Sequence, residues 1–352
     1  MQKIVIDSNL AEIHNTLAKK IDFLRGKSIL ITGGTGFFGL WLLLFLDHVN
    51  RELDLKISVE VNSRDPEKFL SKFPEFSSKY WILWNKSDIR AFVPKSSNYD
   101  FVIHGATTSA SETFHGAEPI EKFSVTYDGT KRLLEQLKNY SIENFLYMSS
   151  GSVYGRDSAG LISENEPTAP FTNELNTSIG HGKRSAEFLC FATMDSHPKI
   201  NINIARCFSF VGPYLPLNLH YAIGNFIKNA LLGEPIALKS QGHSVRSYLY
   251  VSDAISWLMQ ILLSDNQAEV FNIGSEEAIT IKNLAGVFSS ITGLELIFDK
   301  GTKNNAYDPP EVDFYVPNTS KIRNSLGVTV KVGLEDAIVR TIESYPRHTD
   351  KH

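Results

Sequence analysis

A glycine-rich turn is the first feature of the sequence whose residue types and spacing suggest chemistry. It reads Thr32-Gly33-Gly34-Thr35-Gly36-Phe37-Phe38-Gly39, after an apolar stretch at residues 28–32 and before a leucine-rich stretch at 39–49. Glycines let the backbone approach a pyrophosphate closely, and the following helix directs unpaired N–H groups at the phosphates. Because a predicted strand and a predicted helix flank it, the turn predicts a dinucleotide site. The alternative is a glycine turn without a ligand.

The end of the second predicted strand is expected to contact the adenosine ribose. A carboxylate there usually binds the 2′-hydroxyl of NAD, whereas an arginine suits the 2′-phosphate of NADP. The residues found are Asn62, Ser63 and Arg64, with Glu60 two positions earlier. We therefore expect NAD(P), with NADP slightly favoured over NAD. Alternatively, Arg64 is a solvated loop charge.

These residues need a sheet to position them. Strand-like apolar stretches at 28–32, 57–61, 81–84, 101–104, 144–148 and 202–205 alternate with helical stretches, one of them at about 119–138. This alternation predicts an α/β fold: a Rossmann-type doubly wound parallel sheet with helices on both faces. Ahead of it, apolar residues at helical spacing predict a short amphipathic helix over residues 8–22.

The expected organisation has three parts. Residues 1–26 form an N-terminal helical extension, and residues 27–212 form an NAD(P)-binding Rossmann domain. Residues 213–352, which are richer in Pro and Gly and mixed in pattern, form most of a smaller substrate-binding lobe. The two interleave, with a return near 248–275, because Val270-Phe271-Asn272-Ile273 resembles a strand rejoining the sheet.

Composition narrows the function classes. The net charge of −4 and the absence of a basic tract argue against nucleic acid as a main partner. The two cysteines, Cys190 and Cys207, form neither a disulfide framework nor a metal-ligand spacing, so buried reduced thiols are expected and no metal. The N-terminus contains Asp7 and Glu12 and no long apolar stretch, which predicts no signal peptide, no membrane partner and a cytoplasmic location.

The whole arrangement, from about residue 27 to 345, resembles the extended short-chain dehydrogenase/reductase family, the NAD-dependent epimerase/dehydratase group that modifies nucleotide sugars. The motifs that carry the resemblance are TGGTGFFG at 32–39, Asp88-Ile89, HGAT at 104–107, SSGSVYG at 149–155, GHGKRSAE at 180–187, RCFSFVGP at 206–213, VRSYLYVSDA at 245–254, FNIGS at 271–275 and YVPNTSKIRNSLG at 315–327. Together they are specific for fold and ligand class, and much less so for the reaction.

The resemblance implies roles for the matching positions. The cofactor would be bound by Gly33, Thr35, Gly36, Phe37, Phe38, Gly39, Asn62, Ser63, Arg64, Asp88, Ile89, Ala106, Thr107, Lys183, Cys207 and Phe208. The diphosphate of a nucleotide sugar would be held by Arg246, whose planar fork pairs with phosphate oxygens, and contacted by Asn225. Ser209 replaces an asparagine that the family often has on the sugar side. An alternative for Arg246 is a surface salt bridge.

The family's catalytic core is a Ser or Thr with a Tyr-x-x-x-Lys pair, in which the lysine lowers the tyrosine pKa and the tyrosine exchanges a proton with the sugar. Ser150 and Lys183 match two of these positions, but Ile179 occupies the tyrosine position. Ser152, His181 and Tyr154 are candidate substitutes, although His181 points away on a regular helix and Tyr154 is expected to pack structurally. The chain is therefore an engineered inactive variant, a natural member with another acid–base group, or a protein that has kept only binding.

Two further positions bear on the reaction. The family's 4,6-dehydratases have an Asp-Glu pair where this chain has Gly151 and Ser152, and its decarboxylases keep the glutamate. The sequence therefore favours a nucleotide-sugar 4-epimerase or 4-ketoreductase. The alternatives are a dehydratase-like or decarboxylase-like lyase that uses a group other than tyrosine, and a non-catalytic NAD(P)-binding sensor or scaffold.

The resemblance also implies a homodimer, formed through the helix that carries Lys183 and the helix near 119–138. The nucleotide base is not predicted. Tyr221, Tyr315 and Lys239 lie in the C-terminal lobe where base contacts would occur, and nothing in the sequence discriminates among them.

Overall fold

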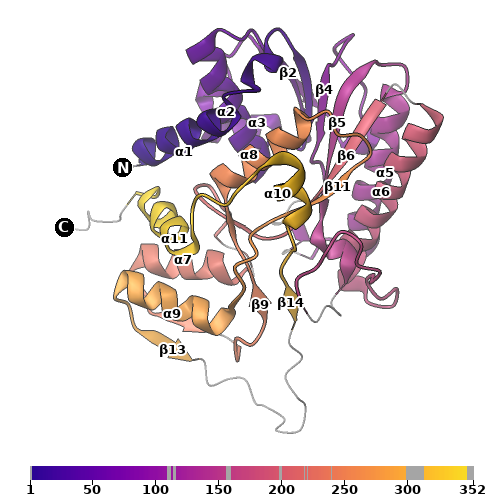
Figure 1. The fold of residues 1–352 in the computed structure, drawn as a ribbon. Helices are drawn as coiled ribbons and strands as arrows, with labels where there is room; N and C mark the ends of the chain where they lie inside the picture. Colours follow the sequence, from indigo (N-terminus) through magenta and orange to yellow (C-terminus); the bar gives the residue numbers. More distant parts are fainter. Residues whose placement is uncertain are drawn as a thin grey trace.

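A parallel sheet of seven strands organises the part of the chain that the computed structural model describes, namely residues 2–108, 112–113, 116–155, 160–197, 200–217, 219, 221–238, 240–298 and 313–346 (Figure 1). Its order is β11-β6-β5-β4-β1-β2-β3, and every neighbouring pair is parallel. The strands are β1 (Ser28–Thr32), β2 (Ser58–Ser63), β3 (Ile82–Lys86), β4 (Phe101–His104), β5 (Ile142–Ser150), β6 (Ile200–Cys207) and β11 (Val270–Ile273). The predicted α/β Rossmann-type sheet is confirmed.

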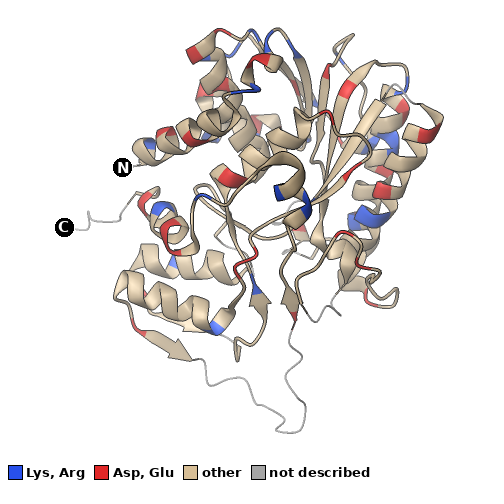
Figure 2. Ribbon diagram, viewed as in Figure 1, with Lys and Arg blue, Asp and Glu red and all other residues tan. Residues whose placement is uncertain are grey.

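Both faces of the sheet are covered by helices. In β1, Ile29 and Ile31 pack into one apolar core while Leu30 packs into the other, as expected when successive side chains point to opposite faces. The first core contains α1 (Gln2–Leu17), α2 (Phe37–Leu53) and α8 (Val251–Leu262), and the second contains α5 (Pro119–Leu137) and α6 (Ser178–Ser196) (Figure 1). Figure 2 shows acidic and basic residues mixed along α5 and α6.

A mixed α/β lobe follows β6. It contains α7 (Ala222–Leu232), α9 (Ile281–Thr292) and α11 (Leu334–Glu343), a three-stranded sheet of β12 (Ile279–Thr280), β9 (Val245–Arg246) and β14 (Phe314–Tyr315), and the pair β8 (Ile236–Leu238) and β13 (Leu296–Phe298). Between its parts, β11 returns to the main sheet and pairs with β6, as predicted. The lobe therefore lies beside the carboxyl end of β6, and the chain leaves it once to add β11 to the main sheet.

The N-terminal helix differs from its predicted bounds. It begins before residue 8 and ends at Leu17, and Ile21–Leu24 form a separate 3-10 turn. Burial of Ile6 and Leu10 against the first core extends the helix toward its start. Asn9 donates a 3.0 Å hydrogen bond to the Tyr250 hydroxyl, and Glu12 accepts one of 2.6 Å from Arg340, so α1 is tied to the C-terminal half of the chain. Within the described ranges, no helix is both long enough and apolar enough to cross a membrane.

Candidate active site

The glycine turn joins β1 to α2, and each glycine has its own reason. Gly33 has a φ of +68°, and a Cβ there would lie 2.8 Å from the backbone of Gly105 and Ala106. A Cβ on Gly39 would collide with the backbone of Gly34. A Cβ on Gly36, by contrast, would lie within 4 Å of one atom only, the Gly33 carbonyl oxygen at 3.4 Å. Gly36 precedes α2 with no side-chain cap, so the first N–H groups of that helix are available to a phosphate.

A buried hydrogen-bond chain fixes the next strand end beside this turn. His104 is fully buried; its Nδ1 lies 2.6 Å from the Thr32 hydroxyl and its Nε2 2.9 Å from that of Thr130. Burial, and secondarily the charge of Lys183, lower the pKa of His104, so the ring is neutral. Since Thr130 donates to the Thr126 carbonyl (2.7 Å), its oxygen accepts from Nε2–H and Nδ1 accepts from Thr32. The chain therefore holds the strand end that leads into Ala106 and Thr107.

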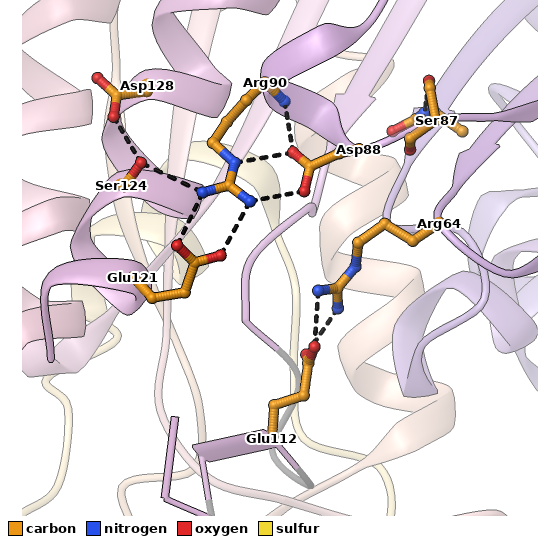
Figure 3. Close-up of polar contacts among 9 residues, drawn as sticks. Arg64, Ser87, Asp88, Arg90, Glu112, Glu121, Ser124 and Asp128 are labelled. Carbon is orange, nitrogen blue, oxygen red and sulfur yellow. Dashed lines mark hydrogen bonds and ion pairs between the residues drawn. The ribbon is translucent and has the colours of Figure 1, made fainter. Parts of the chain in front are cut away.

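The predicted ribose contacts lie at the carboxyl end of β2, and Figure 3 shows one of them, Arg64. Thr35 and Ser63 hydroxyls lie 2.8 Å apart, and the Asn62 amide donates to the Ser87 hydroxyl at 2.8 Å. Arg64 donates two hydrogen bonds of 2.6 Å to the two carboxylate oxygens of Glu112. The pair is exposed to solvent, so Arg64 is a surface charge whose fork is occupied by a carboxylate that the sequence did not point to.

The adenine contacts predicted at Asp88 and Ile89 lie next to this pair. Arg90 donates to Asp88 at 2.8 and 2.9 Å and also to Glu121 at 2.9 Å, and the Arg90 contact holds the pKa of Asp88 below its ordinary value (Figure 3). Ile89 packs so closely on α5 that a Cβ at Gly129 would lie 2.5 Å from its side chain. Glu60 belongs to the interior instead: it is buried and accepts from Tyr99 (2.6 Å) and Asn85 (2.7 Å).

Lys183 and Ser150 meet at the carboxyl end of β5. Lys183 is buried; its Nζ donates a 2.6 Å hydrogen bond to the Met148 carbonyl and lies 4.8 Å from the centre of the Tyr147 ring. Burial lowers the pKa of Lys183 to about 8. Ser150 ends β5, and its oxygen accepts from the backbone N–H of Ser152 at 3.1 Å. The Ser152 hydroxyl is buried and has no hydrogen-bond partner among the described residues.

The structure does not strengthen the case for His181 or Tyr154 as a substitute for the missing tyrosine. Ile179 is half-buried in the first turn of α6. The His181 ring lies 3.2 Å from the Phe171 carbonyl in an exposed contact. Tyr154 is fully buried, donates to Asn272 at 2.8 Å and accepts from Arg206 at 2.8 Å, which is the structural role expected of it.

The remaining predicted residues line the sheet edge and the lobe. Cys207 is opposite Ser150 in the β5–β6 register, and burial raises the pKa of its thiol to about 12. Ser209 follows it, and its carbonyl accepts from Leu249. Asn225 is half-buried on α7. Arg246 forms an ion pair with Asp313 and donates to the Asp313 carbonyl at 2.8 Å, so the salt bridge weighed for it exists. Lys239 lies outside the described residues.

One residue of the lobe comes closer to Ser150 than the sequence indicated. Tyr315 in β14 is paired with Arg246 in β9, and its ring contacts that of Phe208 with centroids 4.7 Å apart. Its hydroxyl lies 2.6 Å from the place that a Cβ on Gly151 would take. The signal that could have found it is the absence of a side chain at Gly151, which leaves room for a group from elsewhere.

Comparison with known proteins agrees with this geometry. The sequence model of a family described as the NAD dependent epimerase/dehydratase family matches residues 29–274. A dTDP-glucose 4,6-dehydratase of Streptomyces niveus is 28% identical over 254 residues, 71% of this chain and 70% of that one. A UDP-glucuronic acid decarboxylase 6 of Arabidopsis thaliana is 27% identical over 317 residues, 90% of this chain and 88% of that one. The solved UDP-glucuronic acid 4-epimerase of Bacillus cereus, in complex with UDP-glucuronic acid and NAD, has the same fold, with a TM-score of 0.73 at 23% identity, covering 90% of this chain and 98% of that one.

Proposed function

The chain belongs to the NAD-dependent epimerase/dehydratase family, and from that premise we propose that it is an NAD(P)-dependent enzyme acting at C4 of a nucleotide-diphosphate sugar, as a 4-epimerase or a 4-ketoreductase. The observation that carries the choice of reaction is the surroundings of Gly151. A Cβ at this position would lie 2.6 Å from the Tyr315 hydroxyl and 2.9 Å from the Phe208 ring. The site therefore has no space for the acidic side chain that elimination would need there.

The residues around the turn fit a dinucleotide. Gly36 leaves an open approach to the N-terminus of α2, and no side chain caps that helix. Lys183, buried at the carboxyl end of β5, would donate to the nicotinamide ribose. When bound, the nicotinamide would supply a hydride acceptor or donor for the sugar carbon. In this proposal residues 27–212 bind the cofactor.

We favour NAD over the NADP that the sequence suggested. A 2′-phosphate at the end of β2 would have to displace Glu112 from the fork of Arg64, whereas a 2′-hydroxyl would not. The neighbouring fork of Arg90 is also engaged, by Asp88 and Glu121. The Bacillus cereus epimerase described above was solved with NAD.

The lobe of residues 213–352 would bind the nucleotide sugar. Arg246 presents a guanidinium beside Tyr315 at the edge of β9, and its present partner Asp313 can be exchanged for a diphosphate. Asn225 on α7 and Ser209 after β6 complete the proposed substrate contacts. The neighbouring hydroxyls of Ser150 and Ser152 would contact the sugar.

Product mass distinguishes the candidate reactions. One portion of the purified protein is heated to release any bound nucleotide for identification. A second, unheated portion is screened by thermal shift with UDP-glucose, dTDP-glucose, CDP-glucose and GDP-mannose, since a ligand specific to the folded state raises stability. The sugar that binds is then incubated with the enzyme and NAD or NADPH. An epimerase leaves the mass unchanged and a reductase adds two hydrogens to a 4-keto substrate. Loss of water or of carbon dioxide would instead support a lyase, the reaction of the two curated relatives.

A second candidate function follows from Ile179. An isoleucine cannot exchange a proton, so a sensor or scaffold that binds NAD(P) without chemistry is consistent with it. Arg246, the proposed contact for the sugar diphosphate, argues against this interpretation, because a pure cofactor sensor has little need of it. Binding of the dinucleotide with no response to any of the four nucleotide sugars would favour the sensor.

We also propose that the protein is a cytoplasmic homodimer. The thiols of Cys190 and Cys207 are free and buried, as is usual in a reducing compartment. On α6, Phe188 and Phe191 are exposed, and Ile120 is exposed on α5, the helix packed beside it. Apolar side chains on two adjacent helices form a surface suited to a four-helix interface with a second copy.

A further inference from the structure

We propose that Tyr315 is the proton-transfer group of this enzyme, in place of the tyrosine that Ile179 replaces. The proposal rests on the proposed function, because it assigns a residue to that same reaction. Its basis is a juxtaposition across the chain: a tyrosine on β14 presents its hydroxyl at the carboxyl end of β5, beside Ser150 and Gly151.

The Tyr315 hydroxyl lies close to residues 150–152. It lies 2.6 Å from the position of a Cβ on Gly151, the residue that follows Ser150. Ser150 is the residue that matches the serine or threonine of the family's catalytic core. A phenol next to this hydroxyl can exchange a proton with the same sugar oxygen that Ser150 contacts.

The segment that contains Ile179 also packs against residues 150–152, from the start of α6. Gly180, the next residue, packs on the carbonyl of Ser152, where a Cβ would lie 2.5 Å away. The first turn of α6 and the end of β14 therefore both border residues 150–152. A tyrosine on β14 can therefore present its hydroxyl to the same residues as a tyrosine on α6 would.

The ring and the backbone of Tyr315 are both fixed by neighbouring residues. Its ring packs on Phe208 with 4.7 Å between centroids, and the Arg246 guanidinium lies 5.8 Å from its ring centre. Its backbone is paired with Arg246 in β9, and the next residue, Val316, accepts a 2.9 Å hydrogen bond from Ile162. A hydroxyl fixed by strand pairing and ring packing meets the geometric requirement for an acid–base group.

The surroundings of Tyr315 keep its hydroxyl protonated. Burial raises the pKa of Tyr315, while the contact with Ser150 and the nearby Arg246 act in the opposite direction. The hydroxyl is thus protonated at neutral pH. In the reducing direction, Tyr315 would give its O–H proton to the sugar 4-keto oxygen and regain a proton from water. A bound reduced nicotinamide would supply the hydride that C4 needs for the ketone to become an alcohol.

The test compares four proteins: wild type, Tyr315→Phe, Tyr315→Phe with Ile179→Tyr, and the control Tyr345→Phe, which removes a hydroxyl bonded to the Leu215 carbonyl at 3.1 Å far along the chain. Turnover is measured with whichever of UDP-glucose, dTDP-glucose, CDP-glucose and GDP-mannose, or its 4-keto form, the wild type converts. Binding of that sugar is measured by calorimetry. We expect Tyr315→Phe to lower kcat by about 10²–10⁴ with little change in Kd, the double variant to recover at least tenfold, and Tyr345→Phe to keep wild-type activity.

The outcomes separate the two proposals. A fall in kcat of less than about tenfold for Tyr315→Phe, with the wild type active, overturns the role of Tyr315 and leaves the proposed function intact. A wild type that converts none of the sugars overturns both. Should Tyr315→Phe fail to fold, Gly151→Ala tests the same contact, because its Cβ would displace the hydroxyl; its control is Gly286→Ala, where a Cβ would meet nothing within 4 Å. Full activity of Gly151→Ala would count against the proposal.

Discussion

Arg64 and Glu112 form a two-pronged ion pair, with both pairs of atoms 2.6 Å apart, at the proposed ribose site beyond the end of β2 (Figure 3). Glu112→Gln removes the charge that occupies the fork of Arg64. We expect the affinity for NADP to rise by about tenfold, because a charge-assisted contact to a phosphate becomes available, while the affinity for NAD changes little. Fluorescence titration with NADPH and NADH measures both. Glu67→Gln, at the exposed pair with Lys86, is the control; equal effects of the two variants would contradict the assignment.

The pair of Arg246 and Asp313 makes a similar prediction for the substrate. Asp313→Asn should strengthen binding of a nucleoside diphosphate severalfold, since Arg246 no longer has to leave a carboxylate, and Arg246→Ala should weaken it by tenfold or more. Arg246→Lys should recover part of the loss, because a lysine offers charge without the planar fork. Calorimetry with UDP, dTDP, CDP and GDP tests this. Unchanged binding in Arg246→Ala would remove the residue from the site.

Lys183 predicts a pH dependence of stability. Burial lowers its pKa from 10.5 to about 8 in the folded protein. Below about pH 8 both the folded and unfolded states hold the proton, and the folded state bears the cost of burying it. Between about 8 and 10.5 the unfolded state holds more protons, so the free energy of unfolding should rise with pH, by about 1 kcal/mol per pH unit. Urea unfolding of wild type against Lys183→Met isolates this slope. Lys228→Met, on the exposed side of α7, should keep the wild-type slope.

The N-terminal helix should contribute to stability through its buried face. Ile13 is completely buried on α1, so Ile13→Ala should lower the free energy of unfolding by about 2–5 kcal/mol. Ile4 is 71% exposed on the same helix, and Ile4→Ala should change it by less than about 0.5 kcal/mol. Chemical denaturation compares them. Similar losses in both variants would contradict the packing explanation, since Ala is a better helix former than Ile and helix propensity alone predicts no loss.

The proposed dimer is tested at α6. Phe188 is 72% exposed, and Phe188→Glu should convert the dimer to a monomer because it places a charge in an apolar contact. Tyr80 is 96% exposed elsewhere on the surface, and Tyr80→Glu is the matched control. Light scattering after size exclusion gives the mass. A wild-type protein that is a monomer at all concentrations would refute the homodimer.

The strands of the sheet were predictable because fully buried parallel strands are short apolar stretches that alternate with helices. Residues 28–32, 101–104 and 270–273 were placed at their observed bounds. The glycine turn was predictable for a local reason, since it needs only the strand before it and the helix after it. In both cases the physical cause lies within a few neighbouring residues.

The pairings at the site were not predictable from sequence. Glu112 follows β4 and Arg64 follows β2, so their ion pair depends on how the ends of two strands are arranged in space. Tyr315 reaches Ser150 only because β14 pairs in one register with β9. A shift of that register by one residue would turn the tyrosine to the other face. Such contacts arise from the packed fold and leave no local pattern.

The attachment of α1 has a consequence for how the chain is made. Its hydrogen-bond partners in α8 and α11 are synthesised long afterwards: Ser252 lies 240 positions beyond Glu12, and Arg340 lies 328 positions beyond it. At roughly 5–20 residues per second, translation takes on the order of ten seconds to a minute to supply them. During that interval the apolar face of α1 lacks its later partners. Strands β1 to β6 precede both partners in the chain, so the contacts of α1 with α8 and α11 can form only after these six strands have been synthesised.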